Sequence, residues 1–354
     1  MSTLEERLNW EVPYLTAGIP GTGGVIRADI EDFVVDEIPA YEPSGEGEHV
    51  YFRVEKRGVA TMDVMDEAAQ KLGLRPRSVS CAGFKDTHAV ARQTFSVQGV
   101  SEKDVEQLQL ANARILWVTR HRNKLRTGHL RGNQFTIRIR DIAPGAAQHA
   151  DEILETLTRR GVPNAYGPQR FGNRGDNQIV GYHLLYGNVE AIWAMGVHPP
   201  KRRMHDFFVS ALQSALFNQV VATRIRAGTL DTVIAGDVAK KEDTGGIFTV
   251  ENPEVEGPRA KAWEISATGP IYGYKMMAAQ AEAGEIEARV LAASGIKLDD
   301  FRSVKATGVR RPLRFNPEGL RWEATDDGLV VSFFAPKGSF ATLLLRELMK
   351  TGDL

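Results

Sequence analysis

A short polar segment between two strand-like runs carries the residues best suited to chemistry. In CAGFKDTHAVARQTFSV (81–97), Gly83 is followed by the charged pair Lys85 and Asp86. A carboxylate held at a strand end beside a cation stays ionised, and it can serve as a nucleophile or base in glycosidic chemistry. Spacing alone also fits an ordinary polar turn, because Lys-Asp pairs are common. The segment supplies one candidate carboxylate, Asp86, and both readings stay open at this point.

The charge is distributed unevenly, although the formal net charge is only −1. Residues 119–140 contain seven basic residues and no Asp or Glu. They are Arg120, Arg122, Lys124, Arg126, Arg131, Arg138 and Arg140. Such a run repels itself unless phosphates neutralise it. Interleaved amides and aromatics suit a nucleic acid, whereas the apolar face that a membrane surface needs is missing.

Two shorter basic groups follow the main run. One is Lys201–Arg203, and the other comprises Arg302, Lys305, Arg310, Arg311 and Arg314. Each group fits a solvated surface as well as it fits contacts with an anionic partner. The sequence leaves both interpretations open.

The composition is that of an ordinary globular protein of 354 residues, for which about 150 residues per domain predicts two domains or one large one. The single cysteine, Cys81, excludes an internal disulfide and a Cys-rich zinc site, and we expect it to be a small buried residue in a reducing cytoplasm. The N-terminal residues lack the order of a signal peptide. No apolar stretch approaches the roughly 18 residues of a membrane span, so we expect a soluble protein.

Several familiar catalytic motifs are absent from the sequence. It contains no GxxxxGK[ST], no HExxH, no CxxC and no GxSxG. This absence argues against a P-loop NTPase, a zinc protease of that class and an α/β-hydrolase. The candidate chemistry therefore rests on the carboxylate and the basic run.

Hydrophobic periodicity predicts the elements that must position these residues. Strands are predicted within 24–57 around the loop EPSGEGE, and near 78–82, 90–98, 113–120 and 133–140. Helices are predicted at 61–72, 101–110, 146–160, through most of 176–227, and at 282–294. Residues 230–275 read as short strands, 330–336 as a strand and 340–350 as a closing helix. This order favours an α+β first domain with an antiparallel or mixed sheet, which the C-terminus rejoins after an inserted middle part.

The segment GFKDTHAVARQTFSV (83–97) resembles the Gly-x-Lys-Asp signature of the TruD family of tRNA pseudouridine synthases. Other blocks are similar to the family's blocks in the same order. They are IEDFVVDEI (30–38), GEGEHVYFRVEKRG (45–58), HRNKLRTGHLRGNQFTI (121–137), VPNAYGPQRFG (162–172), SALQSALFNQVVATRI (210–225), DTGGIF (243–248), GPIYG (269–273) and FFAPKGSFATLLLREL (333–348). Because the blocks cover nearly the whole chain, the resemblance is specific.

The resemblance implies a reaction and a set of site residues. The expected reaction converts uridine to pseudouridine in tRNA, at position 13 of the D-arm, without a cofactor or metal. Asp86 stands in the place of the family's catalytic aspartate, and it either attacks C1′ or removes a C2′ proton. Extruding the target base costs a few kcal/mol, which aromatic stacking offsets by about 1–3 kcal/mol per base. The residues implied at the substrate are Arg27, Phe33, Lys85, Asn133, Phe135 and Phe340, and those at the RNA backbone are Arg120, Arg122, Lys124, Arg126 and Arg131.

Two positions depart from the family pattern. Arg27 stands where close relatives often have Lys, and an ion pair with Asp86 is expected there with altered geometry. Ala91 stands where many relatives have Thr, so a hydroxyl near the catalytic turn is missing. These departures affect the surroundings of Asp86 and leave the carboxylate itself in place.

The fold implied by the resemblance is an α+β pseudouridine-synthase catalytic domain with a mixed, mostly antiparallel sheet. It would comprise residues 1–160 and 308–354, with the family's own domain inserted at 161–307. We expect a monomer with tRNA as its partner and RNA lying between the two domains. Two alternatives remain: a catalytically silent RNA-binding or RNA-folding protein, and a carboxylate enzyme for a small nucleoside or sugar. The dense basic run argues against the second.

Overall fold

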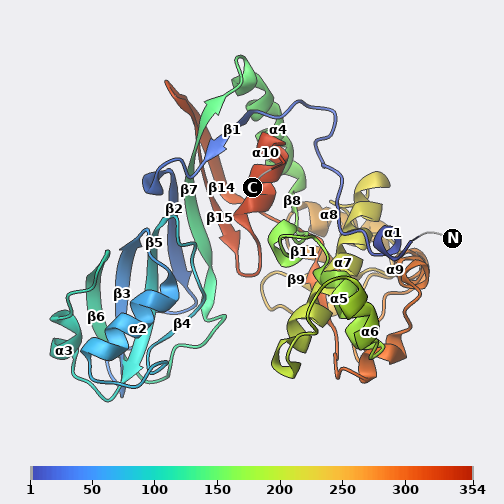
Figure 1. Cartoon of the computed structure of the whole chain (residues 1–354). Coiled ribbons are helices and arrows are strands. Elements are labelled where there is room, and N and C mark those ends of the chain that lie inside the picture. The colour runs from blue at the N-terminus through green and yellow to red at the C-terminus, as the bar shows by residue number, and fades with distance from the viewer. Residues whose placement is uncertain (1–2, 353–354) are drawn as a thin grey trace. The chain divides into compact units, whose positions relative to one another are not determined.

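The computed structural model describes residues 3–352, and these divide into two compact units (Figure 1). The first, which we call the sheet unit, comprises Ile19–Thr158 and the chain from Pro317 onward. The second, the helical unit, comprises the chain up to Gly18 and Arg159–Asn316. These boundaries differ from the expected 160/161 and 307/308, and the first 18 residues group with the middle of the chain. Among the described residues, none of the helices combines the length and apolar character needed to span a bilayer.

The sheet unit is built on a nine-stranded sheet. Its strands are β1 (Gly23–Ile26), β2 (Phe33–Pro39), β3 (His49–Arg57), β4 (Ser80–Cys81), β5 (Val90–Gln98), β6 (Ala113–His121), β7 (Leu130–Ile142), β14 (Glu318–Thr325) and β15 (Gly328–Pro336). The main order is β14-β15-β7-β2-β5-β3-β6, with β1 added to β7 and β4 added to β5. The β2–β5 pair is parallel and the other described pairs are antiparallel. The predicted α+β fold with a mixed, mostly antiparallel sheet is therefore confirmed.

Helix α2 (Thr61–Lys71) covers one end of this sheet because its apolar residues fall on one face. Val64, Met65 and Ala68 are buried at helical spacing and join a core cluster with the apolar residues of β3 and β5. Gly73 follows the helix with φ +69°, a conformation that L side chains rarely adopt, so the chain turns away there. The predicted helix at 61–72 is confirmed to within one residue.

The remaining helices of the sheet unit follow the sequence pattern with one difference. They are α3 (Glu102–Glu106), α4 (Ala146–Arg160), which runs into the other unit, α10 (Ala341–Met349) and the short 3-10 helix η1 (Ile30–Asp32). The predicted helix at 101–110 is shortened to α3, which begins at a capping box between Ser101 and Asp104. The main chain then enters an isolated bridge between Leu110 and Ala113, which leads into β6.

The helical unit surrounds a four-stranded sheet with helices. Its helices are α1 (Leu4–Arg7), α5 (Asn177–Leu185), α6 (Val189–Ala194), α7 (His205–Arg226), α8 (Pro253–Lys261) and α9 (Ala281–Ser294), with 3-10 turns η2 (Pro168–Arg170), η3 (Arg202–Met204) and η4 (Leu298–Arg302). Its strands are β8 (Val162–Pro163), β9 (Val238–Lys241), β10 (Ile247–Thr249), β11 (Ile265–Ile271), β12 (Val309–Pro312) and β13 (Arg314–Phe315). The sheet order is β10-β9-β11-β12, and β13 pairs with β8. The helical 176–227 region and the helix at 282–294 are confirmed, as are short strands within 230–275. The strand prediction is wrong at 253–261, which forms α8, because Asn252 caps a helix there and Pro253 fits its first turn.

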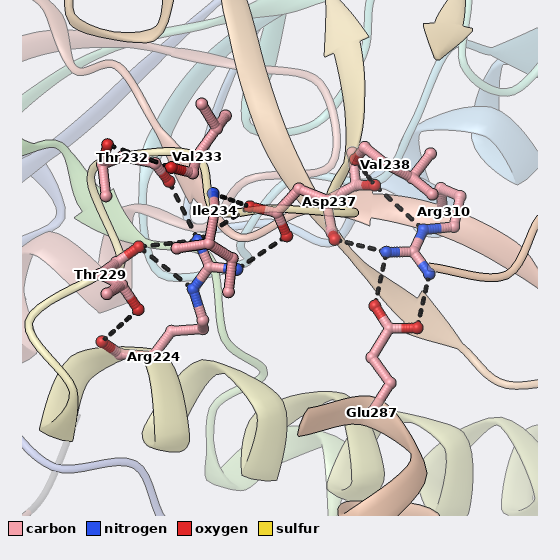
Figure 2. Close-up of polar contacts among 10 residues, drawn as sticks. Arg224, Thr229, Thr232, Val233, Ile234, Asp237, Val238, Glu287 and Arg310 are labelled. Carbon is pink, nitrogen blue, oxygen red and sulfur yellow. Dashed lines mark hydrogen bonds and ion pairs between the residues drawn. The ribbon is translucent and has the colours of Figure 1, made fainter. Parts of the chain in front are cut away.

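Two buried ion pairs lie in the interior of the helical unit (Figure 2). Arg224 of α7 forms a bidentate pair with Asp237 at 2.8 and 3.0 Å, and it also donates to the carbonyls of Thr229 and Thr232 at 2.8 and 3.0 Å. Arg310 of β12 forms the second bidentate pair, with Glu287 of α9, at 2.9 and 2.7 Å. Both arginines have their donors satisfied within the protein, as buried charges require.

In the basic group at 302–314, the last three arginines bind other groups of the protein. Arg310 pairs with Glu287, Arg311 donates to Asn164 at 2.7 Å, and Arg314 donates to main-chain carbonyls of Arg160 and Ala260 at 2.7 and 2.8 Å. Arg310 and Arg314 are buried. For these two residues both earlier readings, a solvated face and a phosphate contact, are wrong.

Candidate active site

The loop between β4 and β5 carries Asp86, and buried polar side chains fix its main chain. Thr61, at the start of α2, accepts a hydrogen bond from the Lys85 amide at 3.0 Å. Thr61 also donates to Gln93 of β5 at 2.9 Å, and Gln93 donates to the Gly83 carbonyl at 3.3 Å. Thr61 and Gln93 are both buried. The loop is therefore held against α2 and β5 on either side of Phe84.

A buried lysine of β3 holds the main chain of Asp86 itself. The Lys56 ammonium donates to the carbonyl oxygens of Asp86 at 2.6 Å and of Val59 at 2.8 Å. Lys56 is completely buried, and this burial lowers its pKa to about 8, with Asp86 opposing the shift and Lys85 adding to it. Its two carbonyl partners partly replace the water that the ammonium loses.

The Asp86 carboxylate points outward and meets a guanidinium. Its side chain is 48% exposed, and Arg27 Nη2 lies 3.3 Å from Oδ1. Arg27 also lies over the ring of Phe33, with 4.3 Å from the guanidinium carbon to the ring centroid. The main chain of Arg27 has φ +59°, which is unfavourable for a non-glycine residue. The expected Arg27–Asp86 contact is present, and it involves a strained main-chain position of the kind that clusters at functional sites.

Lys85, the neighbour of Asp86, points inward. Its ammonium lies 2.7 Å from Glu37 of β2, and both side chains are almost completely buried. The other oxygen of Glu37 accepts from the Thr94 amide of β5 at 3.0 Å. Glu37 therefore links the Asp86 loop to β2 and β5. Lys85 contributes to the site by holding the loop in place, because its ammonium binds Glu37.

The aromatic side chains named from the sequence fall into two groups. Phe33 of β2 and Phe135 of β7 are buried, meet edge to face at 6.0 Å, and Phe135 stacks on Phe333 of β15 at 5.4 Å. Phe340, which precedes α10, is 45% exposed. Phe33 and Phe135 thus belong to the apolar core beneath Arg27, and Phe340 lies at the surface.

Asn133 carries a buried acceptor without a partner. Its side-chain oxygen makes no hydrogen bond to any described residue, although buried polar atoms are nearly always paired. In the sheet, Asn133 of β7 lies opposite Glu37 of β2, the residue that binds Lys85. The unpaired amide oxygen therefore belongs to the strand next to β2, which carries Glu37. A hydrogen-bond donor of a ligand could pair with this oxygen.

The basic run is acid-free in sequence but not in space. Arg120 pairs with Glu102 at 3.2 Å, and Arg122 Nε donates to Glu46 at 3.0 Å. Arg138 and Arg140 pair with Asp327 at 3.1 and 2.9 Å. Lys124, Arg126 and Arg131 form no ion pair with an acidic residue in the part of the chain that the structure describes; Arg131 lies over the Phe334 ring at 5.9 Å. These three cations are the ones available to an external anion.

A pocket of the sheet unit is lined by Tyr41, Glu42, His121, Asn123, Lys124, Arg126 and His129. The Tyr41 hydroxyl meets His129 Nδ1 at 2.9 Å, and the Tyr41 and His121 rings stack at 5.0 Å. Burial, together with repulsion by His49 and Arg122, lowers the pKa of His121. The pocket joins aromatic surface to unpaired cations, a combination that suits a nucleotide.

Three residues near Asp86 were missed in the sequence. Lys56 lies two residues after Val54 and Glu37 two residues after Val35, so alternation places both on the buried faces of β3 and β2, where a charged residue is unusual. The sequence did contain a signal for Phe84: an aromatic residue in a polar turn is exposed unless another part of the chain covers it. Among residues 3–352 no group of histidine, cysteine and acidic side chains has an arrangement for a metal ion. Cys81 is buried, as predicted, and burial raises the pKa of its thiol.

The fold and site define an α+β protein with an exposed carboxylate–guanidinium pair above a mixed sheet. A solved structure of tRNA pseudouridine synthase D from Methanosarcina mazei has the same fold, with a TM-score of 0.81, 24% identity and 98% of each chain covered. The family described as tRNA pseudouridine synthase D (TruD) matches residues 9–201 and 193–348. Among curated proteins, tRNA pseudouridine synthase D of Thermus thermophilus is 47% identical over 97% of this chain and 93% of its own, and that of Geobacter metallireducens is 40% identical over 98% and 99%. The chain belongs to the TruD family of tRNA pseudouridine synthases.

Proposed function

We propose that this chain isomerises uridine to pseudouridine in tRNA, at position 13 of the D-arm, with Asp86 as its catalytic residue. The single observation that carries the proposal is the Asp86 site. An exposed carboxylate meets Arg27 at 3.3 Å and stands on a loop anchored by Thr61, Gln93 and Lys56. The relatives named above are described as tRNA pseudouridine synthase D, which supports the conversion of uridine to pseudouridine in tRNA.

The reaction needs one carboxylate and no external reactant. The N1–C1′ bond breaks, the uracil turns within the site, and a C5–C1′ bond forms. The C5 proton leaves and N1 takes up a proton, so the product is an isomer of the substrate. Asp86 serves either route: its oxygen attacks C1′ and is later displaced, or it removes and returns a C2′ proton. Arg27 orients the carboxylate in both through the contact at 3.3 Å.

The remaining residues bind the extruded uridine. The unpaired Asn133 oxygen accepts the N3–H of uracil. Phe33 and Phe135 form the apolar wall beneath Arg27, and Phe340 offers an accessible ring for stacking. Lys85 acts through Glu37, because its ammonium is buried against that carboxylate.

We assign the catalytic role and the first RNA contacts to the sheet unit, which carries the whole of this constellation. Lys124, Arg126 and Arg131 contact phosphates first, because none of them is engaged by an acidic side chain in the described structure. Arg120 and Arg122 join them by exchanging Glu102 and Glu46 for phosphate. The enzyme acts as a monomer in the cytoplasm, and the chemistry calls for no cofactor.

Tritium release tests the proposal directly. Transcripts of tRNA made with C5-tritiated uridine lose tritium only when the C5–C1′ bond forms. We expect release by the wild type, none by Asp86→Asn, and none when the uridine at position 13 is replaced. Binding of tRNA by Asp86→Asn should stay close to that of the wild type.

Two outcomes would overturn parts of the proposal. Release by Asp86→Asn at the wild-type rate would remove Asp86 from its role. Salt-sensitive tRNA binding without any release by the wild type would favour the catalytically silent RNA-binding protein instead.

A further inference from the structure

Phe84 is the most exposed of the large apolar residues in the described part of the chain. It is 69% exposed and lies two residues before Asp86. Single exposed apolar residues are common on protein surfaces. Phe84 differs from such residues because the main chain on both sides of it is held by hydrogen bonds.

The residues on either side of Phe84 are anchored. The Gly83 carbonyl accepts from Gln93 at 3.3 Å, and the Lys85 amide donates to Thr61 at 3.0 Å. Lys85 turns its side chain inward to Glu37 at 2.7 Å, while Phe84 remains exposed. The ring is therefore presented from a fixed main chain, on the same loop as the exposed Asp86 carboxylate.

A phenyl ring in this position offers a stacking face but no charge and no hydrogen bond. A base that leaves an RNA stack to reach Asp86 exposes the faces of the bases that it leaves behind. Any base can stack on an aromatic ring, because every base has a π face. A ring next to the catalytic carboxylate suits such a face, whatever the identity of the base.

We propose that Phe84 stacks on an RNA base next to the extruded uridine and so stabilises the open form of the substrate. This inference rests on the proposed function, and it adds a positioning residue for that reaction. Phe84 does not touch the reacting atoms. It lowers the free-energy cost of unstacking the uridine. This cost is large in a folded tRNA and small in an unstructured RNA.

The test compares Phe84→Ala and Phe84→Trp with the wild type on two substrates. One is folded tRNA, and the other is a short unstructured RNA with the same uridine and its flanking sequence. Tritium release gives kcat/KM for each. We expect Phe84→Ala to lose about 5- to 150-fold on folded tRNA, equivalent to about 1–3 kcal/mol at 1.4 kcal/mol per tenfold. The loss on the unstructured RNA should be clearly smaller, and Phe84→Trp should retain the wild-type rate.

A matched control separates stacking from the loss of any exposed apolar side chain. Val255 of α8 is 60% exposed in the helical unit, and Val255→Ala should keep the wild-type rate on both substrates. Because Phe84 is exposed, its replacement should leave the unfolding midpoint unchanged. A 2-aminopurine placed beside the uridine reports stacking: its fluorescence should be quenched by Asp86→Asn and less so by the double variant Asp86→Asn/Phe84→Ala.

The outcomes separate this inference from the proposed function. If the wild type releases tritium and Phe84→Ala matches it on folded tRNA, the Phe84 proposal is overturned while the function stands. An equal loss on both substrates would also overturn it, because the contact would then not assist extrusion. If the wild type releases no tritium, the proposed function and this inference fail together.

Discussion

The Lys56 ammonium donates a 2.6 Å hydrogen bond to the main-chain carbonyl of Asp86, so a completely buried lysine supports the residue that carries the exposed carboxylate. The same ammonium reaches the Val59 carbonyl at 2.8 Å. Burial of an ammonium without a carboxylate partner is costly. The chain retains this charge directly beneath the Asp86 loop, which makes the loop sensitive to the state of Lys56.

The first prediction concerns the pH dependence of stability. Burial lowers the pKa of Lys56 to about 8, whereas the reference value of the amine is 10.5. Between these values the unfolded chain binds the extra proton, so this group's contribution to stability increases as the pH rises through that window. Lys56→Met lacks the titration. In urea unfolding at a series of pH values, the wild type should gain stability relative to Lys56→Met from about pH 8 to about pH 10.5. A constant difference would contradict the burial of the charge.

The second prediction concerns the guanidinium at Asp86. Arg27→Ala removes the cation 3.3 Å from the carboxylate, and we expect kcat to fall by about 10²-fold or more, as for other lost electrostatic contacts at reacting groups. Arg27→Lys keeps the charge and should recover part of the rate. Single-turnover tritium release measures both variants. Equal rates for Arg27→Ala and the wild type would show that the pair plays no part in the reaction.

The third prediction uses the unpaired oxygen of Asn133. Because this oxygen has no described partner in the folded protein, Asn133→Ala should leave the free energy of unfolding nearly unchanged. It should lower kcat/KM by about tenfold, the value of one lost hydrogen bond to substrate. Gln134→Ala, at the adjacent position of β7, is the matched control and should retain activity. A large loss of stability in Asn133→Ala would instead indicate a structural role.

The fourth prediction separates free from paired cations in RNA binding. Replacing Lys124 or Arg126 by Ala should reduce the slope of log K against log salt by about 0.7–0.9 each, one phosphate contact per residue. Arg122→Ala should change the slope less, because Glu46 already neutralises Arg122. Filter binding of tRNA by Asp86→Asn carrying each change measures the slopes. Identical slopes for all three changes would contradict the distinction between free and paired cations.

The fifth prediction concerns the interior of the helical unit. Arg310→Met leaves Glu287 buried without its partner and should cost about 3–5 kcal/mol of stability. The double change Arg310→Met/Glu287→Leu removes both charges and should recover most of the loss. Urea unfolding measures both variants. A double variant as unstable as the single one would show that packing, and not the lost partner, sets the cost.

Periodicity was enough to locate most helices and strands, because their buried faces alternate with polar residues, but it missed α8 at Pro253–Lys261. Asp86 was named from the Lys85-Asp86 pair and from the resemblance, because a polar turn alone does not tell which charged residue faces the solvent: Asp86 is exposed and Lys85 is buried. Helix α3 ended early because the chain forms the Leu110–Ala113 bridge, a tertiary feature with no local signal.

The sequence is less informative where charges are buried. Arg310 and Arg314 looked like surface charges, but each has fixed partners in the interior that are distant in sequence. The run 119–140 is free of acids along the chain, yet Glu46, Glu102 and Asp327 reach it in space. Lys56 and Glu37 are charged residues at buried-face positions of β3 and β2, where they contact the Asp86 carbonyl and the Lys85 ammonium. In each case the deciding partner is set by the tertiary fold.

The pairing of β7 has a consequence for how the protein is made. On one edge β7 pairs with β1 and β2, which precede it in the chain, and on the other with β15 at Gly328–Pro336. The ribosome synthesises all of Arg159–Asn316 before β15 emerges. During that interval one edge of β7 has open hydrogen-bonding groups, the kind of edge that pairs wrongly with other chains. A chain truncated after Asn316 would keep that edge permanently, so the last tenth of the sequence acts as the closure of a sheet begun near the first residues.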